Sequence, residues 1–168
     1  QTGDGVVGEF LGNGCKADNW ENIKVHEKFD PSRVENVSFR GENELGYYDS
    51  SVTLFGGVEY QTGISEATIF NCKIGNNTLI HRVNDYIANY EIGDNVIIKN
   101  TDTIAAELDS TFGNGVMVEV LNEGGGRDFP IYEKLSAQLA YLLTPFRHKP
   151  EMIEKCSQMI KDYSEKYK

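Results

Sequence analysis

The sequence predicts a mainly β protein: a parallel β-helix of about four coils, followed by two C-terminal α-helices. Three observations support this fold. Residues 69–104 match themselves when shifted by eighteen positions, so that Ile74-Gly75 falls on Ile92-Gly93. Aliphatic residues recur within this stretch at intervals of six, with Tyr86 at the one position of the series that lacks one. After it, two segments that follow prolines carry apolar residues at helical spacing.

A period of six with a threefold super-period indicates a coil with three short, flat sides, because a helix repeats near 3.6 residues and a lone strand near 2. Each side carries one inward aliphatic side chain, and each residue lies over the residue eighteen positions later. Ile74 is thus expected over Ile92, and Ile80 over Ile98. Each fully buried isoleucine stabilises the stack by roughly 1.5–3 kcal/mol.

Turns are predicted at glycine and asparagine residues between the sides of each coil. Gly75 and Gly93 follow the inward residue, where a residue without Cβ is favoured. Asparagines beside them tolerate left-handed backbone angles and hydrogen-bond their own turns. Asn71 falls on Asn89, so these two side chains are expected to form an amide ladder. Tyr86 is expected to fill the one inward position of the six-residue series that lacks an aliphatic residue.

The 168 residues divide into three predicted parts. Residues 1–14 are glycine-rich and are expected to form a flexible or capping segment. Residues 15–121 form the β-helix domain, whose first coils are irregular. Residues 122–168 form a loop and a two-helix extension. The opening Gln1-Thr2-Gly3 is not typical of a natural start, which predicts a processed, tagged or trimmed chain.

Several elements within these parts can be placed more closely. Trp20 is expected to plug one end of the core, because a large aromatic side chain buries much apolar area. Residues 105–121 are expected to form one more coil with a two-residue insertion. The first helix is expected to begin at Pro130 and end at Pro145, and the second to begin at Pro150.

The formal net charge of −10 makes nucleic acid and anionic membrane poor partners. The three cysteines form no CxxC pair, and no apolar run reaches the length of a membrane span. Together with the absence of a signal peptide, these features predict a reduced, cytoplasmic protein. An anionic small molecule remains a plausible ligand, with candidate basic residues at Arg82, Lys99, Arg127 and the run 147–149.

The segments I-G-N-N-T-L-I (74–80) and I-G-D-N-V-I-I (92–98) resemble the hexapeptide repeats of left-handed β-helix proteins, the trimeric acyltransferase-like superfamily. This resemblance implies a left-handed helix and a homo-oligomer, most naturally a trimer. From about residue 15 onward, segments such as G-C-K-A-D-N-W-E-N-I and V-L-N-E-G-G-G-R-D-F are similar to the N-terminal part of large uncharacterised Bacteroidetes proteins. These are loosely labelled as UDP-N-acetylglucosamine pyrophosphorylase-related, yet no lysine-bearing nucleotidyltransferase loop is visible here.

His81 follows the inward Ile80 and is therefore expected to point outward. A surface histidine acts as general base in hexapeptide acyltransferases, so the resemblance implies a catalytic role for His81. Imidazole suits that role because its pKa lies near neutrality. Arg82 and Asn84 lie close in sequence and are candidates for binding the substrate. The alternative is that His81 is a solvated surface residue without a catalytic role.

The loop after the last predicted coil is a second candidate binding site. Gly124 and Gly125 would expose backbone N–H groups to an anion, Arg127 would add a bidentate contact, and Glu123 would orient a sugar hydroxyl. The alternative is that the glycines only let the chain leave the β-helix. No metal site is predicted, because the coils supply a single histidine and zinc needs three or four ligands.

Two functions from different classes fit these features. The first is a scaffold or oligomerisation module of a sugar-nucleotide-related protein, since no complete chemical site is apparent in the sequence. The alternative is an acyl- or nucleotidyl-transferase that acts on a nucleotide sugar or a similar anionic metabolite. Acetyl-CoA is a cofactor only under this alternative, and the sequence leaves open whether the chain is an enzyme.

Overall fold

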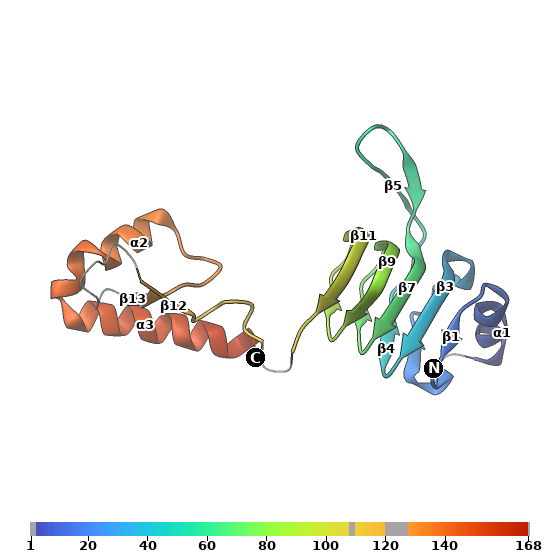
Figure 1. Cartoon of the computed structure of the whole chain (residues 1–168), viewed down its shortest axis with the longest axis horizontal. Helices are drawn as coiled ribbons and strands as arrows, with labels where there is room; N and C mark the ends of the chain where they lie inside the picture. Colours follow the sequence, from blue (N-terminus) through green and yellow to red (C-terminus); the bar gives the residue numbers. More distant parts are fainter. Residues whose placement is uncertain (1–2, 108–109, 120–127, 168) are drawn as a thin grey trace. The chain divides into compact units, whose positions relative to one another are not determined.

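Five parallel strands stack in one sheet along the N-terminal part of the chain (Figure 1). A computed structural model describes residues 3–107, 110–119 and 128–167, and it divides the chain into two units, Gln1–Ala106 and Glu107–Lys168. The first unit is a β-solenoid, which confirms the predicted fold class. Its larger sheet has the order β1-β3-β7-β9-β11, and a four-stranded parallel sheet has the order β10-β8-β4-β2. Five stacked strands mean one more level than the roughly four coils expected.

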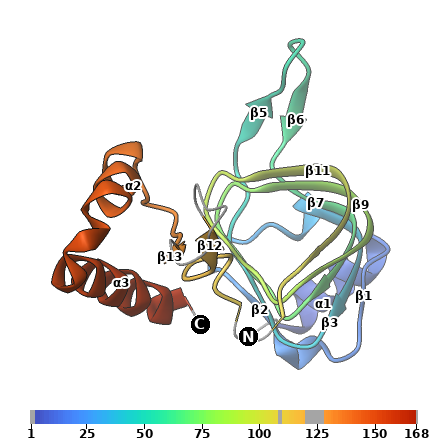
Figure 2. The same cartoon turned by 60° about the vertical axis from the view of Figure 1, so that its left-hand side comes forward.

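The elements of the first unit follow one another as short strands joined by turns (Figure 2). They are α1 (Asp4–Gly12), β1 (Lys16–Ala17), the 3-10 turn η1 (Trp20–Asn22), β2 (Ile23–Val25), η2 (Pro31–Arg33), β3 (Val34–Arg40), β4 (Asn43–Leu45), β5 (Ser51–Thr53), β6 (Glu59–Gln61), β7 (Gly63–Phe70), β8 (Lys73–Ile74), β9 (Leu79–Ala88), β10 (Glu91–Ile92) and β11 (Ile97–Ala105).

The predicted register of eighteen residues is confirmed. Ile80 pairs with Ile98 and Ile74 with Ile92 in successive coils. Ile80 and Ile74 are almost fully buried and belong to the core inside the coils. The predicted amide ladder is also present, since Asn71 Nδ2 donates to Asn89 Oδ1 over 3.4 Å.

The inward position assigned to Tyr86 is occupied by its neighbour instead. Ile87 is fully buried and pairs with Ile104, whereas Tyr86 is 38% exposed. The cause is a bulge in β9, where two residues, Asn84 and Asp85, lie opposite the single residue Asp102 of β11. Side chains close this bulge, because Asn84 donates to Asp102 and Thr103 donates to Asp85. A strict six-residue count does not reveal such an insertion.

The glycine-rich N-terminal segment contains helix α1, which covers the first coil. Phe10 is fully buried, and its ring stacks on Trp20 with a centroid distance of 5.5 Å. Phe39, from the next coil, packs against the ring of Phe10. Trp20 is therefore placed at an end of the core, as the sequence predicted.

The second unit differs from the sequence-based expectation in two respects. Residues 117–119 form a strand antiparallel to residues 128–130, so the further coil expected over 105–121 does not form among the described residues after Ala105, the last residue of β11. Pro130 ends a strand instead of starting a helix, and the helix begins only after Ser136, whose hydroxyl caps it. The elements are β12 (Met117–Glu119), β13 (Asp128–Pro130), α2 (Ala137–Leu143), η3 (Pro145–His148), α3 (Pro150–Ser164) and η4 (Glu165–Tyr167).

Helix α3 begins at Pro150, as predicted, and Pro145 follows the end of α2. No helix among the described residues has the length and apolar character needed to cross a membrane. The three cysteines are free thiols, and burial raises the pKa of Cys15 and of Cys72.

Candidate functional site

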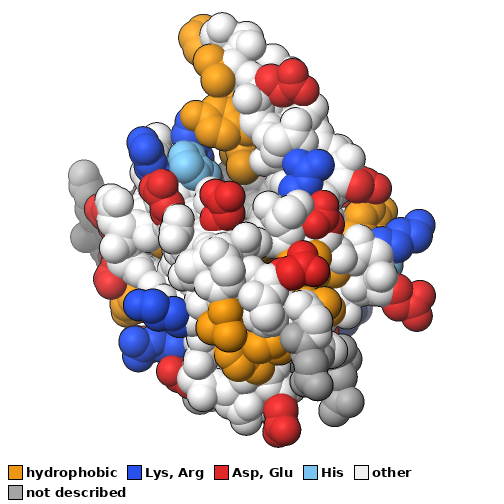
Figure 3. Space-filling model, turned by 90° about the vertical axis from the view of Figure 1, so that its right-hand side faces the viewer, with side chains coloured by type: hydrophobic (Ala, Val, Ile, Leu, Met, Phe, Trp, Pro, Cys, Tyr) orange, Lys and Arg blue, Asp and Glu red, His pale blue; other side chains and the backbone are white. Residues whose placement is uncertain are grey.

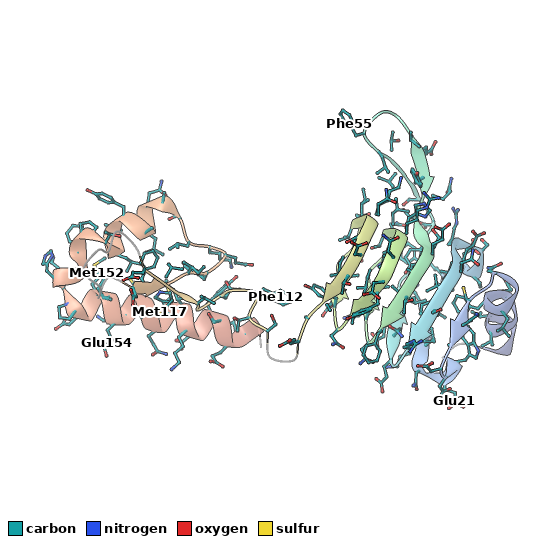
Figure 4. The ribbon with its side chains drawn as sticks, in the orientation of Figure 1. Glu21, Phe55, Phe112, Met117, Met152 and Glu154 are labelled. Atoms are coloured by element: carbon teal, nitrogen blue, oxygen red, sulfur yellow. The ribbon has the colours of Figure 1, made fainter. Side chains whose placement is uncertain are left out.

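A hairpin formed by β5 and β6 projects from the solenoid (Figures 1 and 2). Its foot is held by Thr62, whose hydroxyl donates to Ser50 O, and by Arg33, which donates to Gln61 Oε1 over 2.5 Å. Phe55 at the tip is fully exposed (Figure 4). The hairpin thus brings polar residues of β6 next to the outer face of the coils.

His81 lies on that outer face, in a column formed by three successive coils. It pairs with Ser65 of β7 on one side and with Lys99 of β11 on the other. Tyr60 of β6 approaches from the hairpin, with its ring centroid 5.7 Å from the imidazole. We call these four residues the His81 cluster. Figure 3 shows a histidine side chain at the foot of the hairpin, with basic and acidic side chains beside it.

Two contacts organise the His81 cluster. Ser65 Oγ lies 2.8 Å from His81 Nδ1, which fixes the orientation of the imidazole. The Lys99 ammonium lies over the Tyr60 ring, 3.9 Å from its centroid, and donates a hydrogen bond to the Tyr60 hydroxyl. The hydrogen bond and the cation–π contact together tie the hairpin to the last coil.

The environment of His81 favours its neutral form. Partial burial lowers the pKa of His81 below its usual 6.5, Arg82 and Lys99 lower it further, and Glu66 opposes the shift. When Nδ1–H donates to Ser65 Oγ, the lone pair of Nε2 points away from the protein contact. Within the described part of the chain, Nε2 has no hydrogen-bond partner. An imidazole in this state can accept a proton from a hydroxyl or an amine.

Arg82 and Glu66 occupy a corner beside the cluster. Arg82 Nε lies 3.1 Å from Glu66 Oε2, and both side chains are more than half exposed. Both residues have left-handed backbone angles, with φ of 58° and 53°. Asn36 and Asn100 take the same conformation in the flanking coils. The predicted substrate residue Arg82 therefore lies next to His81, but a carboxylate already occupies its guanidinium.

The structure treats the other predicted binding residues differently. Asn84 donates to Asp102 Oδ1 over 2.7 Å within the bulge of β9, so it serves the coil and not the cluster. The loop residues predicted as a second binding site lie outside the described residues: Glu123, Gly124, Gly125 and Arg127. Among the described residues, no group of three potential metal ligands comes together.

Sequence reasoning missed Ser65 and Tyr60. Ser65 is sixteen residues before His81, because the coil between them is two residues shorter than the regular repeat. Tyr60 lies in an insertion between coils, where the repeat gives no register. A search for polar residues one coil before His81, with the offset allowed to vary, would have found Ser65.

A shallow groove follows the four-stranded sheet on another side of the solenoid. Its outer face carries Lys24, Glu44, Lys73 and Glu91 in register, one per coil. Lys24 pairs with Glu44 and Lys73 with Glu91, each at 3.0 Å. Because these charges satisfy one another in pairs at the surface, they are best explained as cross-strand pairs that support stacking.

The comparisons with known proteins concern nearly the whole chain. Residues 5–168 match the family model described as a domain of unknown function, DUF4954. The chain belongs to this family. A relative of the chain is an uncharacterised protein of Treponema pallidum (strain Nichols), 29% identical over 160 residues. The match covers 88% of this chain and 22% of that protein, so the chain spans less than a quarter of its relative. No solved structure matches the chain significantly.

Proposed function

We propose that this DUF4954 chain carries a group-transfer site in which His81 acts as general base toward a hydroxyl or amino group of an anionic metabolite. The observation that carries the proposal is the 2.8 Å contact between Ser65 Oγ and His81 Nδ1, which leaves Nε2 without a partner among the described residues. The depressed pKa of His81 favours the neutral imidazole near neutral pH, and Nε2 is its unprotonated nitrogen in the tautomer in which Nδ1–H donates to Ser65 Oγ.

The chemistry of the ligand follows from the charges around His81. Lys99 makes this region locally cationic on a chain of net charge −10, whereas Arg82 is paired with Glu66. The similarity of residues 74–80 and 92–98 to hexapeptide acyltransferases favours acyl transfer from acetyl-CoA to a nucleotide sugar. Nucleotidyl transfer to a similar metabolite is the related alternative, in line with the pyrophosphorylase-related resemblance.

The test combines ligand binding with turnover. The whole chain is screened by thermal shift against acetyl-CoA and nucleotide sugars, and thiol release from acetyl-CoA is followed with each stabilising sugar. We expect stabilisation and thiol release in the wild type, with thiol release lost in His81→Asn. The control is His26→Asn, because His26 packs on Tyr47, outside the His81 cluster. Lack of stabilisation and of thiol release with the entire panel would contradict the proposal.

A second candidate, an oligomerisation scaffold, is supported by the exposed end of the solenoid. Strand β11 lies at the edge of its sheet, and Ile97 on it is 46% exposed. Ile98 and Ile104 are only half-buried, although their partners Ile80 and Ile87 are fully buried. A second copy stacked on this edge would bury these side chains. Light scattering should then show a stable homo-oligomer that Ile97→Lys dissociates. A monomer at all concentrations would contradict it.

A further inference from the structure

We infer that the His81 cluster binds a phosphate group, held mainly by the Lys99 ammonium and the Tyr60 hydroxyl. This inference rests on the proposed function and deepens it, because it names the anionic group of the ligand. It assigns a binding role to Lys99 and Tyr60, which lie on the last coil and on the hairpin.

Lys99 has an uncharged partner, whereas Lys24 and Lys73 of the solenoid have carboxylate partners. Lys24 and Lys73 each lie 3.0 Å from a glutamate, so their charges are neutralised. Lys99 forms no ion pair among the described residues, and its ammonium contacts the neutral hydroxyl and ring of Tyr60. A partly enclosed cation with a neutral partner is a ready contact for an anion.

The arrangement of donors favours phosphate over carboxylate. The two donors, Lys99 and Tyr60, come from different strands, β11 and β6, and meet beside His81 of β9. A tetrahedral phosphate accepts hydrogen bonds from several directions, whereas a planar carboxylate is best matched by the forked donors of a guanidinium. The guanidinium of Arg82 lies nearby, but it is already paired with the carboxylate of Glu66.

Local charge supports the same conclusion. Lys99 and Arg82 both act on His81 as cations, and Glu66 is the opposing carboxylate. Because Glu66 pairs with Arg82, Lys99 is the cation that is left without a paired carboxylate among the described residues here, on a chain whose net charge is −10. Such a cation concentrates anions in its neighbourhood. The negative charge of Glu66 therefore weakens phosphate binding, and removal of this charge should strengthen phosphate binding.

The test is a titration of the whole chain with inorganic phosphate, with sodium chloride matched for ionic strength as the reference. The imidazole C–H signals of His26, His81 and His148 are followed by NMR. We expect a saturable shift of His81 alone. Lys99→Gln should weaken phosphate binding by at least about tenfold, and Tyr60→Phe should weaken it less. Glu66→Gln should tighten it. Lys73→Gln, which removes a paired lysine elsewhere on the solenoid, should leave it unchanged.

Three results would overturn the inference: an equal shift with chloride, shifts at all three histidines, or unchanged binding in Lys99→Gln. Acetate that binds as tightly as phosphate would overturn the choice of phosphate. Failure of the proposed function can be told apart from failure of this inference. Phosphate binding without any transfer activity would contradict only the role of His81 as a base. Transfer activity without phosphate binding would instead remove only this inference.

Discussion

Glu66 and Arg82 follow the paired residues Ser65 and His81, and both adopt left-handed backbone angles while their side chains form an ion pair of 3.1 Å. Side chains with a Cβ pay a steric penalty in this conformation, and asparagine tolerates it best after glycine. The flanking coils place Asn36 and Asn100 at this corner. Other corners of the solenoid take the same angles at asparagines such as Asn71 and Asn89, so Glu66 and Arg82 differ from these corners in residue type and not in backbone conformation.

The double variant Glu66→Asn/Arg82→Asn should therefore be more stable than the wild type. Relief of strain should contribute roughly 0.5–1 kcal/mol per residue, and the loss of an exposed ion pair should cost less than about 1 kcal/mol in total. Urea denaturation measures the change in the free energy of unfolding. A clear loss of stability would show that the ion pair, and not function, explains the two charges.

The stacking of glycines gives a matched pair of substitutions. A Cβ on Gly75 would lie 2.6 Å from the backbone carbon of Gly93 in the next coil, whereas a Cβ on Gly93 would meet nothing within 4 Å. Gly75→Ala should destabilise the solenoid by about 1–3 kcal/mol, and Gly93→Ala should be nearly neutral in the monomer. Equal effects on the urea midpoint would contradict the stacking. If copies stack on the last coil, Gly93→Ala should also weaken the oligomer.

Truncation of the isoleucine column tests the core. Ile80 is fully buried between Ile64 and Ile98, so Ile80→Ala should cost about 2–5 kcal/mol. Ile97 is 46% exposed, and Ile97→Ala is the control that should cost much less. Denaturant unfolding of both variants measures the difference. Similar losses would mean that the inward and outward faces are wrongly assigned.

The regular repeat made most of the solenoid predictable. Residues 69–104 contain their own register, so the columns through Ile74 and Ile80 could be predicted from the eighteen-residue offset. The offset failed at Tyr86, because the bulge of β9 adds residues without changing the local composition. It also failed after Ala105, where an echo of the repeat at 112–118 includes a strand paired antiparallel in the second unit.

The candidate site was only partly predictable for a related reason. The outward position of His81 follows from that of its neighbour, and Lys99 lies eighteen residues later in register. Tyr60 comes from a hairpin inserted between coils, and its contact with Lys99 spans thirty-nine residues. Local sequence patterns do not encode such a contact, since it depends on how the insertion folds back.

The depressed pKa of His81 predicts how stability depends on pH. Well above pH 6.5 the imidazole is neutral in both the folded and the unfolded chain and contributes nothing to the pH dependence of stability. Below 6.5 the unfolded chain takes up a proton first, so the wild type loses stability until the folded state is protonated as well. His81→Asn should therefore gain stability relative to the wild type as the pH falls through this range. Parallel urea midpoints against pH would contradict the shift.

The most direct test of the account is the pH titration of the His81 imidazole, followed by NMR in the wild type, Glu66→Gln and Lys99→Gln. The wild type should titrate with a midpoint below 6.5. The midpoint should be lower still in Glu66→Gln and higher in Lys99→Gln, because Glu66 raises the pKa of His81 and Lys99 lowers it. A midpoint at or above 6.5 that is the same in all three proteins would mean that His81 is a solvated surface histidine, and it would contradict the proposed role.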